Sequence, residues 1–153
     1  FGQDVRDLIS ALGGLPVLVR LCSPSHPEDT VDDAVVALSQ LCLDEETVAE
    51  FVCLGGLQVL ADLLLDESKS TRIHSHVLEF LPRTLLNDEV IVAFVDLGVI
   101  PALIKQCKES NTTLVRRALV VLTILSRVDE VAERLMKTGI LLVEPLFLIC
   151  EAN

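Results

Sequence analysis

The chain has 153 residues, 51% of them hydrophobic, and a formal net charge of −11 at pH 7. This length is typical of one domain with a sizeable core, and the negative charge disfavours nonspecific binding to nucleic acid or to an anionic membrane surface. No run approaches the roughly 18 apolar residues of a membrane span, because Glu144 and Pro145 interrupt the most apolar tail, and no amino-terminal signal peptide is visible.

A glycine recurs along the chain at a nearly constant interval, each time between two apolar segments. Gly13, Gly55, Gly98 and Gly139 are 42, 43 and 41 residues apart. Two further series repeat every 42 residues: Val31, Ile73 and Val115, and then Leu38, Phe80 and Leu122. Repetition at about 40 to 47 residues is typical of helical solenoids. Because a solenoid offers a long surface and no single deep core, the pattern favours binding over catalysis.

In chain order, each repeat reads as a short helix, a glycine, a second helix and a longer third helix. The first copy is DVRDLISALGG, LPVLVRLC and a third helix over about 30–43. The second is DEETVAEFVCLGG, LQVLADLLL and a third helix over about 71–81. The third is NDEVIVAFVDLG, VIPALIKQC and a third helix over about 114–127. Acidic residues complement the dipole at the start of the short helices, and glycine ends these helices in the left-handed conformation.

We expect a single solenoid over 1–153, divided into repeat segments of about 1–22, 23–65, 66–107 and 108–153. The three third helices should pack side by side at roughly 9–10 Å, with small side chains buried at their contacts: Ala34, Ala37 and Ala118. Pro82 falls within the third helix of the middle repeat, where a proline in an otherwise regular helix destabilises it by about 3 kcal/mol. We therefore expect that helix to end or kink at Pro82; the alternative is that a kink there reshapes the binding surface.

The last segment, ILLVEPLFLIC, reads as a second helix without a following third helix or a polar cap. Terminal repeats of natural solenoids usually carry a polar outer face. We therefore expect the chain to be a fragment of a longer array. A further repeat or another chain should cover its apolar residues, which are Leu142, Leu146, Phe147 and Ile149.

The polar residues form no pattern typical of a catalytic or metal site. His74 and His76 lie two apart, so on a helix they point roughly 200° away from each other and cannot readily share one ion. Acidic pairs such as Asp32 and Asp33 fall at predicted helix starts. The sequence contains no nucleophile elbow, phosphate loop or zinc-protease motif. We expect no catalytic residue, no cofactor and no metal, and therefore no enzyme.

Five cysteines are scattered through apolar segments without a C-x-x-C pair: Cys22, Cys42, Cys53, Cys107 and Cys150. This distribution predicts reduced thiols that pack as small hydrophobic side chains in a cytoplasmic protein, and a nuclear location stays open. A disulfide framework or a zinc site is the less favoured interpretation.

A short helix, a glycine, a second helix opening G-[LVI]-P-x-L-[VI] and a third carrying A-x-x-A-L resembles the armadillo repeat. The clearest copies are GGLPVLVRL with VDDAVVALSQLC and GVIPALIKQ with VRRALVVLTIL; the middle copy, GGLQVLADLL with IHSHVLEFLPRTLL, is more divergent. The resemblance implies an all-α, right-handed superhelix of three-helix repeats. HEAT repeats are the alternative, although they typically have two helices and lack the glycine-linked short helix.

The resemblance also implies a concave groove along the third helices. In the nuclear-import adaptors, a tryptophan and an asparagine four residues later hold an extended basic peptide there. Their positions fall on Val36, Leu78 and Val120, and on Gln40, Pro82 and Ile124. None matches, so we do not expect a basic nuclear-localisation peptide as the ligand. An alternative for the apolar row is that neighbouring helices of the fold bury it.

One turn earlier along the third helices, the charge of the groove residues changes sign, from acidic in the first repeat to basic in the third. We therefore expect a ligand with an apolar middle, a basic group towards the first repeat and an acidic group towards the third. The predicted groove residues are Asp32, Asp33, Val36, Gln40, Ser75, Leu78, Pro82, Arg116, Arg117, Val120 and Ile124.

The implied function is a non-enzymatic protein–protein interaction scaffold or adaptor that binds an extended or helical peptide segment. A regulatory domain acting on a GTPase or a chaperone, and a structural spacer, are the alternatives. A role as a cell-polarity scaffold stays open, although no residue of the sequence points to it specifically. We expect a protein or peptide partner, no nucleic acid and no membrane insertion.

Overall fold

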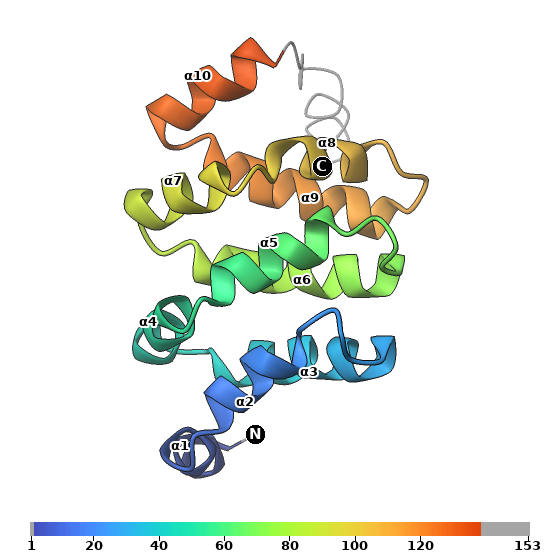
Figure 1. Ribbon diagram of the computed structural model, residues 1–153. Coiled ribbons are helices and arrows are strands. Elements are labelled where there is room, and N and C mark those ends of the chain that lie inside the picture. The colour runs from blue at the N-terminus through green and yellow to red at the C-terminus, as the bar shows by residue number, and fades with distance from the viewer. Residues whose placement is uncertain (1, 139–153) are drawn as a thin grey trace.

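The computed structural model describes residues 2–138, and within them the chain is all-α, as the sequence predicted. The helices follow in the order α1 (Gln3–Ala11), α2 (Gly14–Leu21), α3 (Glu28–Leu41), α4 (Glu45–Cys53), α5 (Gly56–Leu65), α6 (Thr71–Thr84), α7 (Asp88–Asp96), α8 (Ile100–Cys107), α9 (Thr112–Leu125) and α10 (Asp129–Lys137). They stack as successive repeats from α1 at one end to α10 at the other, with the short helices α4, α7 and α10 along one edge (Figure 1). The predicted apolar end at Leu142, Leu146, Phe147 and Ile149 lies outside the described residues, as does Gly139.

Glycine joins the short helix of each repeat to the second helix. Gly13, Gly55 and Gly98 have φ values of 73°, 81° and 81°, which is the left-handed region that residues with a Cβ rarely adopt. The chain therefore turns sharply at the same place in each repeat, as the recurring glycines predicted.

Side-chain caps begin most of the short and third helices. Asp44 accepts a hydrogen bond from the Thr47 backbone N–H at 2.8 Å and another from the Thr47 hydroxyl at 2.8 Å. Asn87 caps α7 in the same way, through the Val90 N–H at 3.0 Å. Each cap satisfies a backbone donor that has no partner within the helix, so the polar loops fix where these helices start.

Replacement of the α4 cap gives a pH-dependent test of this arrangement. The Thr47 hydrogen bonds hold the pKa of Asp44 below its ordinary value, so ionised Asp44 stabilises the fold above the unfolded-state pKa of about 3.9. That stabilisation is lost as the pH falls through the lowered folded-state pKa. We expect Asp44→Ala to lower the free energy of unfolding by about 1 kcal/mol at pH 7 and by progressively less below pH 4, measured by urea denaturation.

The matched control is Asp44→Asn, which keeps the accepting oxygen and removes the titrating proton. It should stay close to the parent in stability at pH 7. An Asp44→Ala effect of the same size at pH 7 and at pH 2 would show that the cap does not act through the ionised carboxylate.

The core runs without interruption through the repeats. Phe51 of α4 and Phe80 of α6 are fully buried, and their ring centroids lie 5.1 Å apart. Cys22 and Cys42 are free thiols buried in the same core, and burial raises the pKa of each to about 12. These two cysteines pack as small apolar side chains, as predicted, whereas Cys53 is exposed.

The third helices pack side by side, but the middle one is shifted by one residue from the predicted alignment. They begin 15, 16 and 14 residues after the glycine of their repeat, because the second helices and the loops that follow them differ in length. Burial follows the helix starts and not a constant step of 42: Leu38, Leu81 and Leu122 are equivalent. The predicted equivalence of Val31, Ile73 and Val115 is therefore wrong at its middle member, where His74 takes the place of Ile73.

The shift also changes the predicted helix contacts. Ala34 and Ala118 are buried, as expected, but Ala37 is only half-buried. Val77 is the residue of α6 that is equivalent to Ala34 and Ala118, whereas a constant step of 42 residues would place His76 there. The prediction that this helix ends at Leu81 is also wrong, since α6 continues through Pro82 to Thr84.

Pro82 lies in the last turn of α6, where its missing N–H removes the backbone bond that would reach the carbonyl of Leu78.

Candidate functional site

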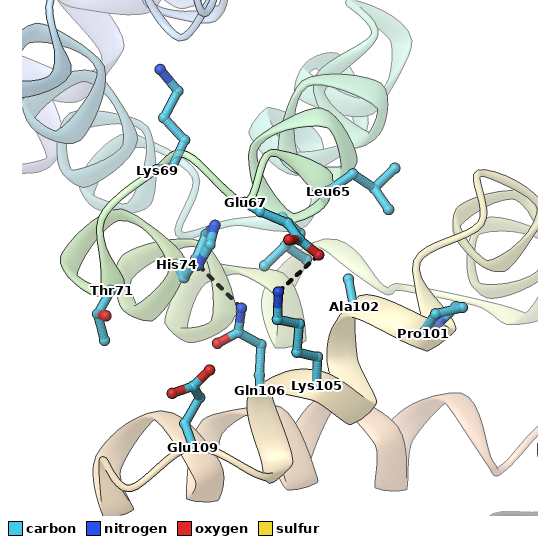
Figure 2. A pocket seen from close by; sticks show the side chains of 11 residues that line it. Leu65, Glu67, Lys69, Thr71, His74, Pro101, Ala102, Lys105, Gln106 and Glu109 are labelled. Carbon is cyan, nitrogen blue, oxygen red and sulfur yellow. Dashed lines mark hydrogen bonds and ion pairs between the residues drawn. The ribbon is translucent and has the colours of Figure 1, made fainter.

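The two histidines that invited a metal interpretation lie in different environments. His74 is buried, and its Nε2 lies 3.0 Å from the Leu63 carbonyl oxygen and 3.2 Å from that of Asp66. Its Nδ1 lies 3.1 Å from Nε2 of Gln106 on α8, within a cavity between the second and third repeats (Figure 2). His76 instead faces α3. Within residues 2–138 no group of three His, Cys, Asp or Glu side chains could hold a metal ion.

The outward side of α3, α6 and α9, here called the third-helix face, is the candidate binding surface. The helix starts align Val36, Glu79 and Val120 in its central row, in place of the predicted Val36, Leu78 and Val120. Leu78 is 0% exposed and belongs to the core, whereas Val120 is 50% exposed. Neighbouring helices therefore bury Leu78, which was the alternative interpretation of the predicted apolar row.

The next row shifts in the same way. It contains Gln40, Arg83 and Ile124, and Pro82 is displaced from it by one residue. Arg83 Nη1 donates to the Ser39 carbonyl of α3 at 2.6 Å. This arginine therefore links two repeats on the face where the armadillo resemblance predicted the asparagine positions.

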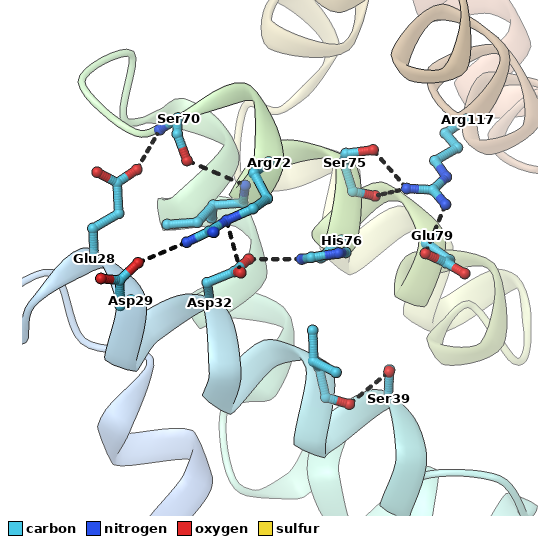
Figure 3. Close-up of polar contacts among 12 residues, drawn as sticks. Glu28, Asp29, Asp32, Ser39, Ser70, Arg72, Ser75, His76, Glu79 and Arg117 are labelled. Carbon is cyan, nitrogen blue, oxygen red and sulfur yellow. Dashed lines mark hydrogen bonds and ion pairs between the residues drawn. The ribbon is translucent and has the colours of Figure 1, made fainter.

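Charged side chains join α3 to α6 (Figure 3). Asp32 is 5% exposed; its Oδ2 lies 2.9 Å from Arg72 Nε, and its Oδ1 lies 2.6 Å from His76 Nδ1. Arg72 also pairs with Asp29 at 2.8 Å, and the Asp29 hydrogen bond and the Asp32 charge raise its pKa. Asp32 is therefore engaged within the fold, and the prediction that it offers a free charge to a ligand is wrong.

The same helices are linked near their starts by Glu28, which accepts the Ser70 backbone N–H at 2.7 Å. The Ser70 hydrogen bonds hold the pKa of Glu28 below its usual value. Because a carboxylate of one repeat accepts from the helix start of the next, this contact fixes the position of α6 against α3.

A second set of polar contacts joins α6 to α9. Arg117 Nη1 donates to the Ser75 carbonyl at 3.0 Å and to the Ser75 hydroxyl at 2.5 Å, and its Nη2 pairs with Glu79 at 2.8 Å (Figure 3). The predicted groove residues Ser75 and Arg117 thus bind each other. Within the described residues, exposed Arg116 and exposed Asp33 make no hydrogen bond or ion pair.

A hollow of about 340 Å³ lies between α6 and α9 on this face. Its walls combine an apolar floor with arginine on one side and a carboxylate on the other. The lining residues are Leu78, Glu79, Pro82, Thr113, Arg116, Arg117 and Val120. Such a hollow can accept an apolar side chain whose neighbour carries a negative charge towards Arg116.

Sequence reasoning missed Glu79, Arg83 and Thr113 as members of this face, and Arg72 as the partner of the acidic first repeat. One available signal was that Arg72 follows Asp29 by 43 residues, close to the repeat length. Opposite charges one repeat apart face each other when third helices stack.

No single helix among residues 2–138 is long and apolar enough to cross a membrane. Two bent pairs, α4 with α5 at 72° and α7 with α8 at 86°, pass that test together by length and composition only.

Comparisons with known proteins agree with this architecture. The sequence profile described as "Armadillo/beta-catenin-like repeat" matches residues 2–43. The designed armadillo repeat protein YIII(Dq)4CqI shares the fold with a TM-score of 0.77 at 20% identity, over 90% of this chain and 58% of the design. The design YIII(Dq.V1)4CPAF, solved in complex with the peptide (KR)4, gives 0.76 at 20% identity over 90% and 58%.

A third solved structure, of computationally designed armadillo repeat proteins for modular peptide recognition, gives a TM-score of 0.69 at 24% identity over 81% of this chain and 51% of that one. The chain thus spans somewhat more than half the length of the designs it resembles. No curated protein matches it. The armadillo repeat profile matches residues 2–43, and the fold along about nine tenths of the chain is that of an armadillo-repeat solenoid.

Proposed function

We propose that the protein is a non-catalytic scaffold that binds an extended peptide segment of a partner protein along the third-helix face. The observation that carries the proposal is the distribution of charges that the fold leaves unpaired. Asp33 lies on α3 and Arg116 on α9, and the hollow floored by Leu78, Pro82 and Val120 lies between α6 and α9.

The solved relatives support peptide binding as the activity of this fold. One was designed for modular peptide recognition and another was solved with the basic peptide (KR)4. In this chain the unpaired charges differ in sign between the first and third repeats. We therefore expect a ligand of mixed charge, with a basic group near Asp33 and an acidic group near Arg116.

The size of the ligand follows from the helix spacing. Three helices at roughly 10 Å span about 20 Å, which is enough for about six extended residues at 3.3 Å each. The side chain over the hollow should be apolar, because Val120 presents an exposed apolar surface there.

The test is a pair of six-residue peptides of identical composition, one with lysine first and glutamate last and the other reversed, both with leucine at the fourth position. Fluorescence anisotropy should show that one of the two peptides binds the protein more tightly than the other. Arg116→Glu should weaken that binding about tenfold, because an exposed ion pair is replaced by like charges.

Arg127→Glu makes the same charge change on an exposed arginine just past the end of α9 and is the matched control. It should leave the affinity nearly unchanged. Equal binding of both peptides, or equal loss in both variants, would refute the proposed charge order.

Under this proposal the protein resides in the cytoplasm or nucleus, where the thiols of Cys22 and Cys42 stay reduced. A regulatory action on a GTPase or a chaperone would be detected as accelerated nucleotide release. No contact of the described residues favours that role over peptide binding.

A further inference from the structure

A second cavity lies away from the third-helix face, between the loop after α5, the start of α6 and the outer side of α8 (Figure 2). Its volume is about 440 Å³, within the usual range of ligand sites. Leu64, Leu65, Pro101 and Ala102 form an apolar wall. The other lining residues are polar: Glu67, Lys69, Thr71, His74, Lys105, Gln106 and Glu109.

The hydrogen bonds of His74 determine what Gln106 presents to this cavity. A backbone carbonyl only accepts, so Nε2 of His74 carries the hydrogen that faces the Leu63 oxygen at 3.0 Å. In the neutral ring Nδ1 is then an acceptor, and the side-chain amide nitrogen of Gln106 donates to it at 3.1 Å. The amide oxygen of Gln106 must point the other way.

That oxygen is an acceptor without a donor. Gln106 is 6% exposed, and within residues 2–138 no group donates to its Oε1. Figure 2 shows the oxygen directed away from His74, towards the part of the cavity lined by Thr71 and Glu109. The Gln106 Oε1 atom therefore faces the cavity and receives no hydrogen bond from the described part of the protein, so a donor that enters the cavity can bind it.

The charges around the cavity point to a cationic donor. Lys105 pairs with Glu67 at 2.8 Å, and Lys69 lies 3.9 Å from Asp66. Both lysines therefore have a carboxylate partner, whereas Glu109 has none among the described residues. The lining groups that still lack a partner are Gln106 Oε1, the Glu109 carboxylate and the Thr71 hydroxyl; the first two can only accept a hydrogen bond, and the hydroxyl can also accept one.

We infer that this cavity binds an alkylguanidinium group, as carried by an arginine side chain of a partner protein or by a free amine such as agmatine. A guanidinium offers several N–H donors in a plane, enough for both Gln106 and Glu109. Its methylene stem suits the apolar wall at Leu64 and Ala102. The cavity shares no lining residue with the hollow on the third-helix face, so the proposals for the two sites can be tested independently.

The experiment is a titration of the 15N-labelled 153-residue chain, followed by NMR, with N-acetyl-arginine amide, agmatine and the neutral isostere N-acetyl-citrulline amide. We expect saturable shifts of the Gln106 side-chain amide and of the Ala102 and Glu109 backbone amides with both guanidinium probes. The citrulline probe should bind at least about tenfold more weakly. A preference for N-acetyl-arginine amide indicates a protein ligand, and a preference for agmatine a free amine.

Two variants test the acceptors. Gln106→Met removes the Oε1 acceptor that faces the cavity, and Glu109→Gln removes an exposed charge that makes no contact among the described residues; each should weaken arginine-probe binding about tenfold or more. Glu133→Gln, at an exposed residue of α10, is the control and should bind as the parent does. Equal binding of the citrulline probe, unsaturable shifts, or unchanged affinity in Glu109→Gln would overturn the assignment.

Discussion

Leu78→Asp is expected to unfold the protein, whereas Val120→Asp should leave its melting temperature almost unchanged. Leu78 is 0% exposed and lies in the core, while Val120 is 50% exposed on α9. Truncation of a buried leucine to alanine already costs about 2–5 kcal/mol, and a buried carboxylate without a partner costs more. Domains of this size are stable by only about 5–15 kcal/mol, so the loss is decisive.

Circular dichroism during thermal and guanidinium denaturation gives the measurement, with Leu78→Met as the control for a change of shape without charge. That variant should lose less than about 1.5 kcal/mol. The experiment separates the two alignments of the middle repeat. If a constant 42-residue step were correct, Leu78 and Val120 would both lie on the surface, and both aspartate variants would fold.

Gly56→Ala is expected to destabilise the protein by about 1–3 kcal/mol, although alanine usually favours a helix over glycine. A Cβ at Gly56 would lie 2.3 Å from the Cζ atom of Phe51. The Phe51 ring cannot readily move away, because it is fully buried against Phe80. The close approach of α5 to α4 therefore depends on the missing side chain.

Urea denaturation of four proteins forms the cycle: the parent, Gly56→Ala, Phe51→Leu and the double variant. The double variant should recover part of the loss from Gly56→Ala, since leucine leaves room for the new methyl group. Gly2→Ala is the control, because a Cβ there meets nothing within 4 Å. An increase in stability for Gly56→Ala alone would show that this contact is not restrictive.

The helices could be predicted from the sequence because their signals are local. The recurring glycines and the apolar spacing together placed α3 and α9 within about two residues of their observed bounds. The armadillo architecture followed from the repetition of these signals. Residues 2–43, which match the family profile, include one of the two copies that resembled it best.

The alignment of α6 could not be predicted from periodicity alone. Apolar or buried residues occupy neighbouring positions along it, as at Val77 with Leu78 and at Phe80 with Leu81. Two alignments one residue apart therefore satisfy the hydrophobic pattern about equally well. The combined length of the second helix and the loop after it decides between them, and that length carries no hydrophobic signal of its own.

The ionic contacts on the third-helix face were also beyond sequence reasoning. Asp32 and Arg117 were predicted to be available to a ligand, but both are engaged by the neighbouring repeat. Long charged side chains can reach several partners, and only the stacked helices show which one is within hydrogen-bond distance. The unpaired pair, Asp33 and Arg116, differs from the engaged pair by a single position in each helix.

The unequal lengths of chain between the glycine and the third helix of each repeat also bear on how such repeats could be recombined. A segment transplanted between arrays by cutting at fixed distances from the glycine would rotate its third helix by about 100° for each residue of difference in that length. The graft would then present core leucines to solvent and bury the residues meant for the ligand. Junctions placed at the capping residues Ser70 and Asn111 would keep each binding row intact, whatever the length of the loop.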